Sequence, residues 1–224
     1  KKVTTLGPII HNPQAVSALE KKGVTVANSL CDCKKESTVV IRSHGVPKSV
    51  YDELKKRNLE YEDATCPFVE KIHRIVENAS AKGDIILIAG DKNHPEVEGI
   101  MGFAATPVFV FETLDELQNI LNNIPNYQKN SVTAVSQTTF DSILWKKSEK
   151  FIEKVCTNAK IFDTICDATS KRQKEAEQLS RQSDLMIVIG GRQSSNTAKL
   201  KSICQKNCKT ILCETADELD EQLI

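Results

Sequence analysis

The sequence is poor in aromatic residues and carries no excess charge. Aromatic residues make up 5% of its 224 residues, and 30 Lys and Arg balance 30 Asp and Glu. A nucleic-acid-binding face combines clustered basic side chains with aromatic rings on which bases stack. We therefore expect no nucleic-acid partner.

The sequence also contains no long apolar run. None approaches the ~20 residues that a membrane-spanning helix needs, and the first printed residues do not have the charged-then-apolar pattern of a secretion signal. We therefore expect a soluble, cytoplasmic protein without a membrane partner. In that setting its eight cysteines are expected to be reduced, buried or metal-bound rather than disulfide-paired.

Two groups of cysteines lack the spacing of a zinc site. Cys31 and Cys33 form a Cys-x-Cys, whereas Cys204, Cys208 and Cys213 lie near the printed C-terminus. Neither group contains a Cys-x2-Cys pair, and the two groups are far apart in the sequence. We interpret them as incidental thiols rather than ligands.

A repeat organises the sequence. The stretch Asp63–Pro67 (DATCP) has a counterpart one hundred positions later at Asp163–Asp167 (DTICD), and a charged run and an apolar strand follow each. The strands end at Gly90 and Gly190, and a polar residue stands four positions after each glycine, His94 or Ser194. Similarity at a fixed offset indicates structural repeats. Gly7 and His11 have the same spacing and indicate a third copy.

The alternation of strands and helices predicts an α/β fold with parallel strands. The repeat divides the chain into three pseudo-symmetric α/β units around a shared centre, spanning residues 1–65, 66–165 and 166–224. In two copies the cysteine precedes the polar residue by 28 positions. We therefore expect a third cysteine about 17 residues before Lys1, and a further strand and polar turn beyond Ile224.

Local signals place several elements. Pro67 suits the first turn of a helix, and the segment that carries His94 is expected to be a loop between strands. Two capping boxes are predicted, one at Thr113 with Glu116 and one at Thr215 with Glu218.

The cysteines of the repeat are candidate ligands. Converging strand ends would bring them together, and three thiolates can hold an iron–sulfur cluster or a zinc ion. A cluster with three protein ligands leaves one iron open to a substrate oxygen. The alternative for Cys66 and Cys166 alone is that both are inert buried thiols.

Polar residues at the strand ends form a candidate anion site. The histidines follow strands beside small or turn-forming residues, and the Ser-Ser-Asn after Gly190 offers hydroxyls and an amide to a phosphate. The tripeptide equally matches a helix N-cap, and we interpret His73 as a surface or packing residue. The candidate donors are His11, His44, His94, Ser194, Ser195 and Asn196.

Two further residues are candidates for proton transfer. Glu96 lies two positions after His94, and negative neighbours would raise the pKa of its carboxyl. Glu98 is interpreted as a solvated carboxylate. Thr138, between Gln137 and Thr139, occupies the place of His44 in the second copy. It could hold substrate or a proton-relaying water, although a threonine there equally suits a strand.

Together these residues resemble the 4-hydroxy-3-methylbut-2-enyl diphosphate reductase family along essentially the whole chain. The motifs that carry the resemblance are GPIIHN at 7–12, RSHGV at 42–46, DATCP at 63–67, HPEVEG at 94–99, SQTT at 136–139, TICDAT at 164–169 and SSN at 194–196.

The resemblance implies a trefoil of three α/β units around a [4Fe-4S] cluster, with Cys66 and Cys166 as two of its three protein ligands. It implies that Glu96 and Thr138 deliver protons while the allylic hydroxyl of the substrate is removed with two electrons, giving isopentenyl and dimethylallyl diphosphate. Ferredoxin or flavodoxin would supply the electrons singly. The implied diphosphate-binding residues are His11, His44, His94, Thr138, Ser194, Ser195 and Asn196.

The sequence departs from this family at both ends. The Gly-Phe-Cys-type loop that supplies the first cluster ligand is absent, as is a Thr-Ala-Gly-Ala-Ser-type segment that contacts the diphosphate. Three other readings of the same residues remain: a cluster-free module that binds a phosphorylated ligand, an inactive fragment of the reductase, and a subunit completed by another chain.

Overall fold

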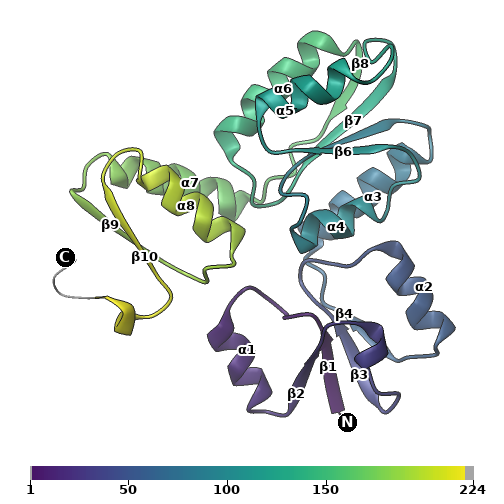
Figure 1. The fold of residues 1–224 in the computed structure, drawn as a ribbon, viewed down its shortest axis with the longest axis vertical. Coiled ribbons are helices and arrows are strands. Elements are labelled where there is room, and N and C mark those ends of the chain that lie inside the picture. Colours follow the sequence, from purple (N-terminus) through teal and green to yellow (C-terminus); the bar gives the residue numbers. More distant parts are fainter. Residues whose placement is uncertain (1, 220–224) are drawn as a thin grey trace. The chain divides into compact units, whose positions relative to one another are not determined.

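The described residues, 2–219 of a computed structural model, contain three parallel sheets (Figure 1). The strand orders are β2-β1-β3-β4, β6-β5-β7-β8 and β10-β9. The strands are β1 (Lys2–Leu6), β2 (Val24–Ala27), β3 (Ser37–Ile41), β4 (Tyr61–Asp63), β5 (Ile85–Ala89), β6 (Val108–Phe111), β7 (Ser131–Ser136), β8 (Asn158–Ile161), β9 (Leu185–Ile189) and β10 (Lys209–Cys213). The predicted α/β class with parallel strands is confirmed.

Helices connect the strands in the crossover arrangement that parallel pairing requires. In Figure 1, α3 and α4 lie beside one face of the second sheet, and α5 and α6 lie beside the other. The helices are α1 (Pro13–Glu20), α2 (Lys48–Lys56), α3 (Pro67–Ser80), α4 (Pro95–Met101), α5 (Leu114–Asn122), α6 (Ser142–Val155), α7 (Asp167–Ser180) and α8 (Ser195–Cys204), with 3-10 turns η1 (Leu30–Asp32) and η2 (Ala216–Glu218). Within the described residues, no helix is both long and apolar enough to cross a membrane.

The chain divides into two compact units. The first comprises Lys1–Ile10, Gln14–Gln137 and Ile143–Thr164 and holds the two four-stranded sheets. The second comprises His11–Pro13, Thr138–Ser142 and Ile165–Ile224 and holds the β9–β10 pair; its residues 220–224 lie outside the described residues.

The three copies of the repeat adopt the same local structure. In each, the glycine that follows β1, β5 or β9 donates its backbone N–H to the carbonyl of the last residue of the neighbouring strand, β2, β6 or β10. These bonds run from Gly7 to Ala27 (2.7 Å), from Gly90 to Phe111 (2.9 Å) and from Gly190 to Cys213 (3.0 Å). The third copy at His11, predicted from the spacing of Gly7, therefore has the same strand-end geometry as the other two.

The structure corrects two local predictions. The segment after His94 is not a loop but the helix α4. At the first capping box, Thr113 Oγ1 accepts the Glu116 N–H at 3.2 Å, but the Glu116 carboxylate accepts from Glu112 N at 2.6 Å rather than from the cap residue. The second box is wrong: Thr215 makes no side-chain cap, and its helix is only a 3-10 turn.

His73 belongs to the core between α3, α4 and the second sheet. That core includes Ile72, Val76, Ile88 and Val97. His73 is 3% exposed, its ring stacks on Phe103 with centroids 4.2 Å apart, and its buried Nε2 has no hydrogen-bond partner. Burial lowers the pKa of His73 to about 4, against the opposing effect of the Asp63 and Glu77 charges. The packing interpretation of His73 is confirmed.

We predict that His73 makes the fold sensitive to mild acid. Below its ordinary pKa of 6.5 the unfolded chain binds a proton that the folded core excludes, so stability present above pH 6.5 is lost as the pH falls toward 4. Urea unfolding at pH 7 and pH 5 should show a smaller loss in His73→Leu than in the parent protein, by about 2 kcal/mol. Equal losses in the two proteins would contradict this prediction.

Candidate functional site

Cys66 and Cys166 occupy the same position in their respective units. Each is the N-cap of a 14-residue helix, α3 or α7, with φ and ψ of −58° and 132° at Cys66 and −64° and 134° at Cys166. Each donates its backbone N–H, at 3.0 Å, to the carbonyl of a residue that follows the neighbouring strand: Ser43 for Cys66 and Thr138 for Cys166. Main-chain hydrogen bonds therefore hold both cysteines at equivalent positions of the repeat.

The two thiols remain available to a ligand. Both are partly exposed, and neither side chain caps its helix. Each lies at the positive end of a helix dipole, which favours negative charge. By contrast, Cys156, Cys204 and Cys213 are buried, and burial raises the pKa of the Cys156 and Cys204 thiols. All eight cysteines are free thiols.

His94 and Ser194 are also equivalent. Each is an N-cap, of α4 and α8 respectively, and each side chain accepts a backbone N–H from its own helix. The bond from Glu96 N to His94 Nδ1 is 3.2 Å, and that from Thr197 N to Ser194 Oγ is 3.3 Å. A neutral imidazole that accepts at Nδ1 carries its proton at Nε2. His94 can therefore donate to an anion while it caps α4.

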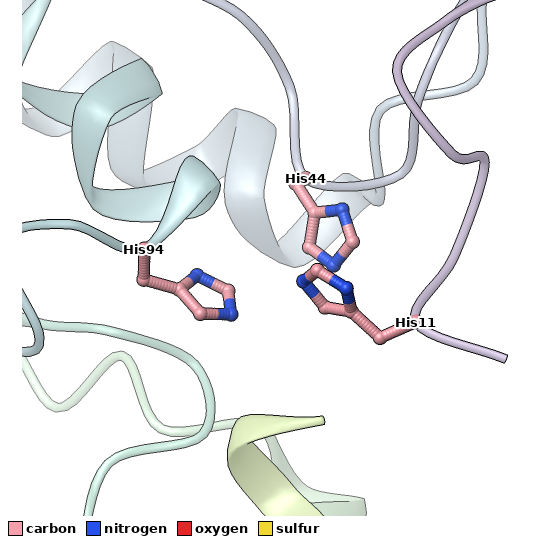
Figure 2. A group of neighbouring side chains, drawn as sticks. All are labelled: His11, His44 and His94. Atoms are coloured by element: carbon pink, nitrogen blue, oxygen red, sulfur yellow. The ribbon is translucent and has the colours of Figure 1, made fainter. Parts of the chain in front are cut away.

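The structure brings two of the predicted histidines together. The rings of His44 and His94 meet edge to face with centroids 5.5 Å apart. Ser43 donates to the Ile9 carbonyl through its N–H at 3.2 Å and its hydroxyl at 2.9 Å, which joins the segment after β1 to the loop that carries His44. Figure 2 shows the His44 and His94 rings, the latter at the start of α4. Protonated nitrogens so grouped can bind an anion, and deprotonated ones a metal ion.

Glycines allow these loops to approach closely. Gly45 has a φ of +71°, a conformation that favours glycine, and a Cβ there would lie 2.5 Å from His73 Cε1. A Cβ at Gly99 would lie 3.5 Å from the His44 carbonyl oxygen. The helix that carries His94 thus packs directly against the loop that carries His44.

Glu96 and Glu98 differ sharply in environment. Glu96, in the first turn of α4, is 2% exposed, whereas Glu98 is exposed. Residues two apart point to nearly opposite sides of a helix but to the same side of an extended segment. The helical conformation of α4 therefore separates the two carboxyl groups. The interpretation of Glu98 as solvated agrees with this placement, and Glu96 is the carboxyl held in the interior beside His94.

The second unit gathers the remaining candidates. Thr138 is 7% exposed and its carbonyl accepts from Cys166, while Thr139 Oγ1 donates to Ser195 Oγ at 3.0 Å. Asn196 Oδ1 is buried without a hydrogen-bond partner. Ser194 is the N-cap of α8, so the Ser-Ser-Asn tripeptide begins a helix. The side-chain oxygen of Asn196 is left as an unused hydrogen-bond acceptor.

Sequence reasoning missed the role of Ser43. It lies within the RSHG motif beside His44, and its hydroxyl, N–H and carbonyl together join the Ile9 and Cys66 segments. Its position between Arg42 and His44 was the available signal, since short hydroxyl side chains commonly bond to nearby backbone.

We predict that the capping and ligand roles of His94 can be separated. Asn is among the best N-cap residues and Ala among the poor ones. His94→Ala should lower the free energy of unfolding by about 1 kcal/mol, and His94→Asn should lower it by less than half of that. Urea unfolding of the two variants measures the difference, and equal destabilisation would show that the cap does not contribute.

Known proteins resemble the chain along its whole length. Residues 1–224 match the family model described as LytB protein. Curated proteins named 4-hydroxy-3-methylbut-2-enyl diphosphate reductase are similar to the chain: one from Thermoanaerobacter sp. (strain X514) is 45% identical over 100% of this chain and 77% of its own length. One from Clostridioides difficile (strain 630) is 41% identical over 97% of this chain and 77% of its own length.

Solved structures resemble the chain as well. The structure of the E-1-hydroxy-2-methyl-but-2-enyl-4-diphosphate reductase from Plasmodium falciparum matches with a TM-score of 0.89 and 29% identity, over 99% of this chain and 69% of that one. A structure of (E)-4-hydroxy-3-methyl-but-2-enyl diphosphate reductase matches with a TM-score of 0.68 and 38% identity, over 99% and 78%. The chain belongs to the LytB protein family.

Proposed function

We propose that the protein is a 4-hydroxy-3-methylbut-2-enyl diphosphate reductase. Its family membership and its relatives of that name support this function. The observation that carries it is the equivalence of Cys66 and Cys166, each held at the start of a 14-residue helix with a partly exposed thiol. Two cysteines so matched fit a ligand set repeated around one cofactor better than two incidental thiols.

The cofactor is a [4Fe-4S] cluster, for which Cys66 and Cys166 supply two ligands. Thiolates are the usual protein ligands of such clusters. The partly exposed, free thiols at two helix N-termini fit this role, because the helix dipole favours a negative ligand there. When bound there, the cluster would supply one-electron chemistry for the reduction.

The overall architecture is a trefoil of three α/β units, divided at residues 1–65, 66–165 and 166–224. The matching order of the two four-stranded sheets supports this division, and β9 and β10 correspond to β5 and β6 in the second sheet. The core that joins α3 to β5 and β7 supports a boundary near residue 66.

The diphosphate is bound by polar strand ends from all three copies. His94 donates from Nε2 while its Nδ1 accepts from the Glu96 backbone, and His44 adds a second ring beside it. Hydroxyl and amide donors offer neutral hydrogen bonds to phosphate oxygens. The proposed set is His11, His44, His94, Thr138, Ser194, Ser195 and Asn196.

The reaction breaks the allylic C–O bond, consumes two electrons and two protons, and releases water. One proton converts the departing hydroxyl to water, and the other is added to carbon to give isopentenyl or dimethylallyl diphosphate. Glu96 is the proton donor because its carboxyl is buried two residues from His94, and Thr138 relays or orients the proton. Ferredoxin or flavodoxin supplies the electrons one at a time.

We predict that cluster assembly depends on Cys166 but not on Cys208, another partly exposed thiol of the same unit. After anaerobic reconstitution with iron and sulfide, Cys166→Ser should lose the visible absorption and the Mössbauer signal of the cluster. Cys208→Ser should retain both. A parent protein that stays colourless would refute the cluster, and thus separate the reductase from a cluster-free phosphate-binding module.

We predict that Glu96 is required for turnover but not for the cluster. Glu96→Gln keeps the shape of the side chain and removes its proton, so turnover should fall by about 10²- to 10⁴-fold while the absorption of the cluster is unchanged. Glu98→Gln, on the exposed face of the same helix, is the matched control and should retain turnover. Full activity in Glu96→Gln would remove this carboxyl from the mechanism.

A further inference from the structure

A cavity of about 410 Å³ lies at the carboxyl ends of three neighbouring strands of the first sheet. Its lining includes Leu6 at the end of β1, Asn28 after β2 and Arg42 after β3, together with Pro47, Ser49 and Val50 at the start of α2. This volume falls within the range of small-molecule pockets, and open parallel sheets hold ligands at this edge. None of the lining residues belongs to the proposed reductase site.

Arg42 is a cation that forms no ion pair within the described residues. Its Nε is buried and has no hydrogen-bond partner. Among the described residues no carboxylate forms an ion pair with it, and Glu98 acts on it only at longer range. Burial lowers the pKa of Arg42 from its ordinary value, yet an arginine remains charged at neutral pH. An isolated, partly desolvated charge is costly unless a ligand compensates it.

In the second sheet, the residue that corresponds to Arg42 is Gln137, and its side chain has a hydrogen-bond partner. A Cβ at Gly7 would lie 2.6 Å from Arg42 Nη1, and one at Gly90 would lie 3.0 Å from Gln137 Oε1, so Arg42 and Gln137 cover equivalent glycines. Gln137 is 2% exposed, and its Oε1 accepts the N–H of Asp91, the residue after Gly90, at 3.2 Å. The residue after Gly7 is Pro8, which has no N–H. A guanidinium could not accept such an N–H in any case, so the first sheet places a donor-only cation where the second sheet has a neutral amide whose oxygen is hydrogen-bonded.

The other walls of the cavity fit an aliphatic anion. Glu53 also lines it, but its carboxylate is paired with Arg57 at 2.6 Å and Lys56 at 3.8 Å. Pro47 makes no side-chain cap, and the Val50 N–H donates to the Pro47 carbonyl at 2.9 Å, which leaves the N–H groups of Lys48 and Ser49 at the start of the nine-residue helix α2 for a ligand. Apolar wall is supplied by Leu30, Val46 and Val50.

We propose that this cavity binds a small aliphatic anion of the alkyl phosphate class. The phosphate lies against the Arg42 guanidinium and the start of α2, and the alkyl group lies against Leu30, Val46 and Val50. The inference stands on the first sheet alone and does not depend on the reductase activity.

Methyl NMR of the full chain with butyl phosphate tests the proposal. The Leu30, Val46 and Val50 methyl signals should shift with a dissociation constant of ~1 mM or below, and inorganic phosphate should bind more weakly. Arg42→Gln should weaken butyl phosphate binding by about tenfold or more. Arg74→Gln, which removes an exposed arginine of the same unit, should bind as the parent protein does.

A second variant keeps the test independent of folding. Arg42→Lys retains the positive charge but replaces the planar guanidinium with an ammonium group. It should bind butyl phosphate with an affinity between those of the parent protein and Arg42→Gln. The proposal is overturned if the parent protein shows no shifts at these three methyl groups, if shifts occur only at residues outside the cavity, or if Arg42→Gln binds as tightly as the parent.

Discussion

The candidate site depends on one repeated backbone hydrogen bond. In each unit the N–H of a cysteine donates to the carbonyl of the residue that follows the neighbouring strand, Ser43 for Cys66 and Thr138 for Cys166. Because this bond uses no side chain, it fixes the start of α3 and α7 while leaving each thiol for a ligand. The same carbonyl-bearing residues sit in the loops that carry the proposed substrate donors. A single main-chain contact thereby links a proposed cluster ligand to proposed substrate donors within a unit.

Close backbone approach is the second constraint. Gly90 and Gly190 end equivalent strands, and a Cβ at either would collide with the helix that follows, at Val97 or Thr197. These glycines let the N-cap residues His94 and Ser194 stand directly over the strand ends. The N-terminal copy also has a glycine at this position, Gly7, but the side chain that covers it is Arg42. Both residues line the cavity of the first sheet.

Much of the site could be predicted from sequence because its residues recur at fixed spacing. The offset between Cys66 and Cys166 and the glycine-to-polar spacing at His11, His94 and Ser194 survive in the structure as equal backbone geometry. The helix after His94 was missed, because histidine is not a usual N-cap residue and a seven-residue segment containing Gly99 has little helical signal. The Thr215 box failed because the Glu218 N–H donates to the Thr215 carbonyl at 3.3 Å and the Thr215 hydroxyl makes no cap bond.

The sequence by itself determined the parallel α/β class, the threefold repeat and the residue types at each strand end, because these depend on local periodicity and on spacing along the chain. Tertiary structure decided which of those side chains are buried and what they contact. Glu96 and Glu98 are neighbours in sequence, and only the helical turn of α4 places one inside and one in solvent. Arg42 covers Gly7 because β1 and β3 pair in parallel and bring together segments distant in sequence, and its Nε has no hydrogen-bond partner there.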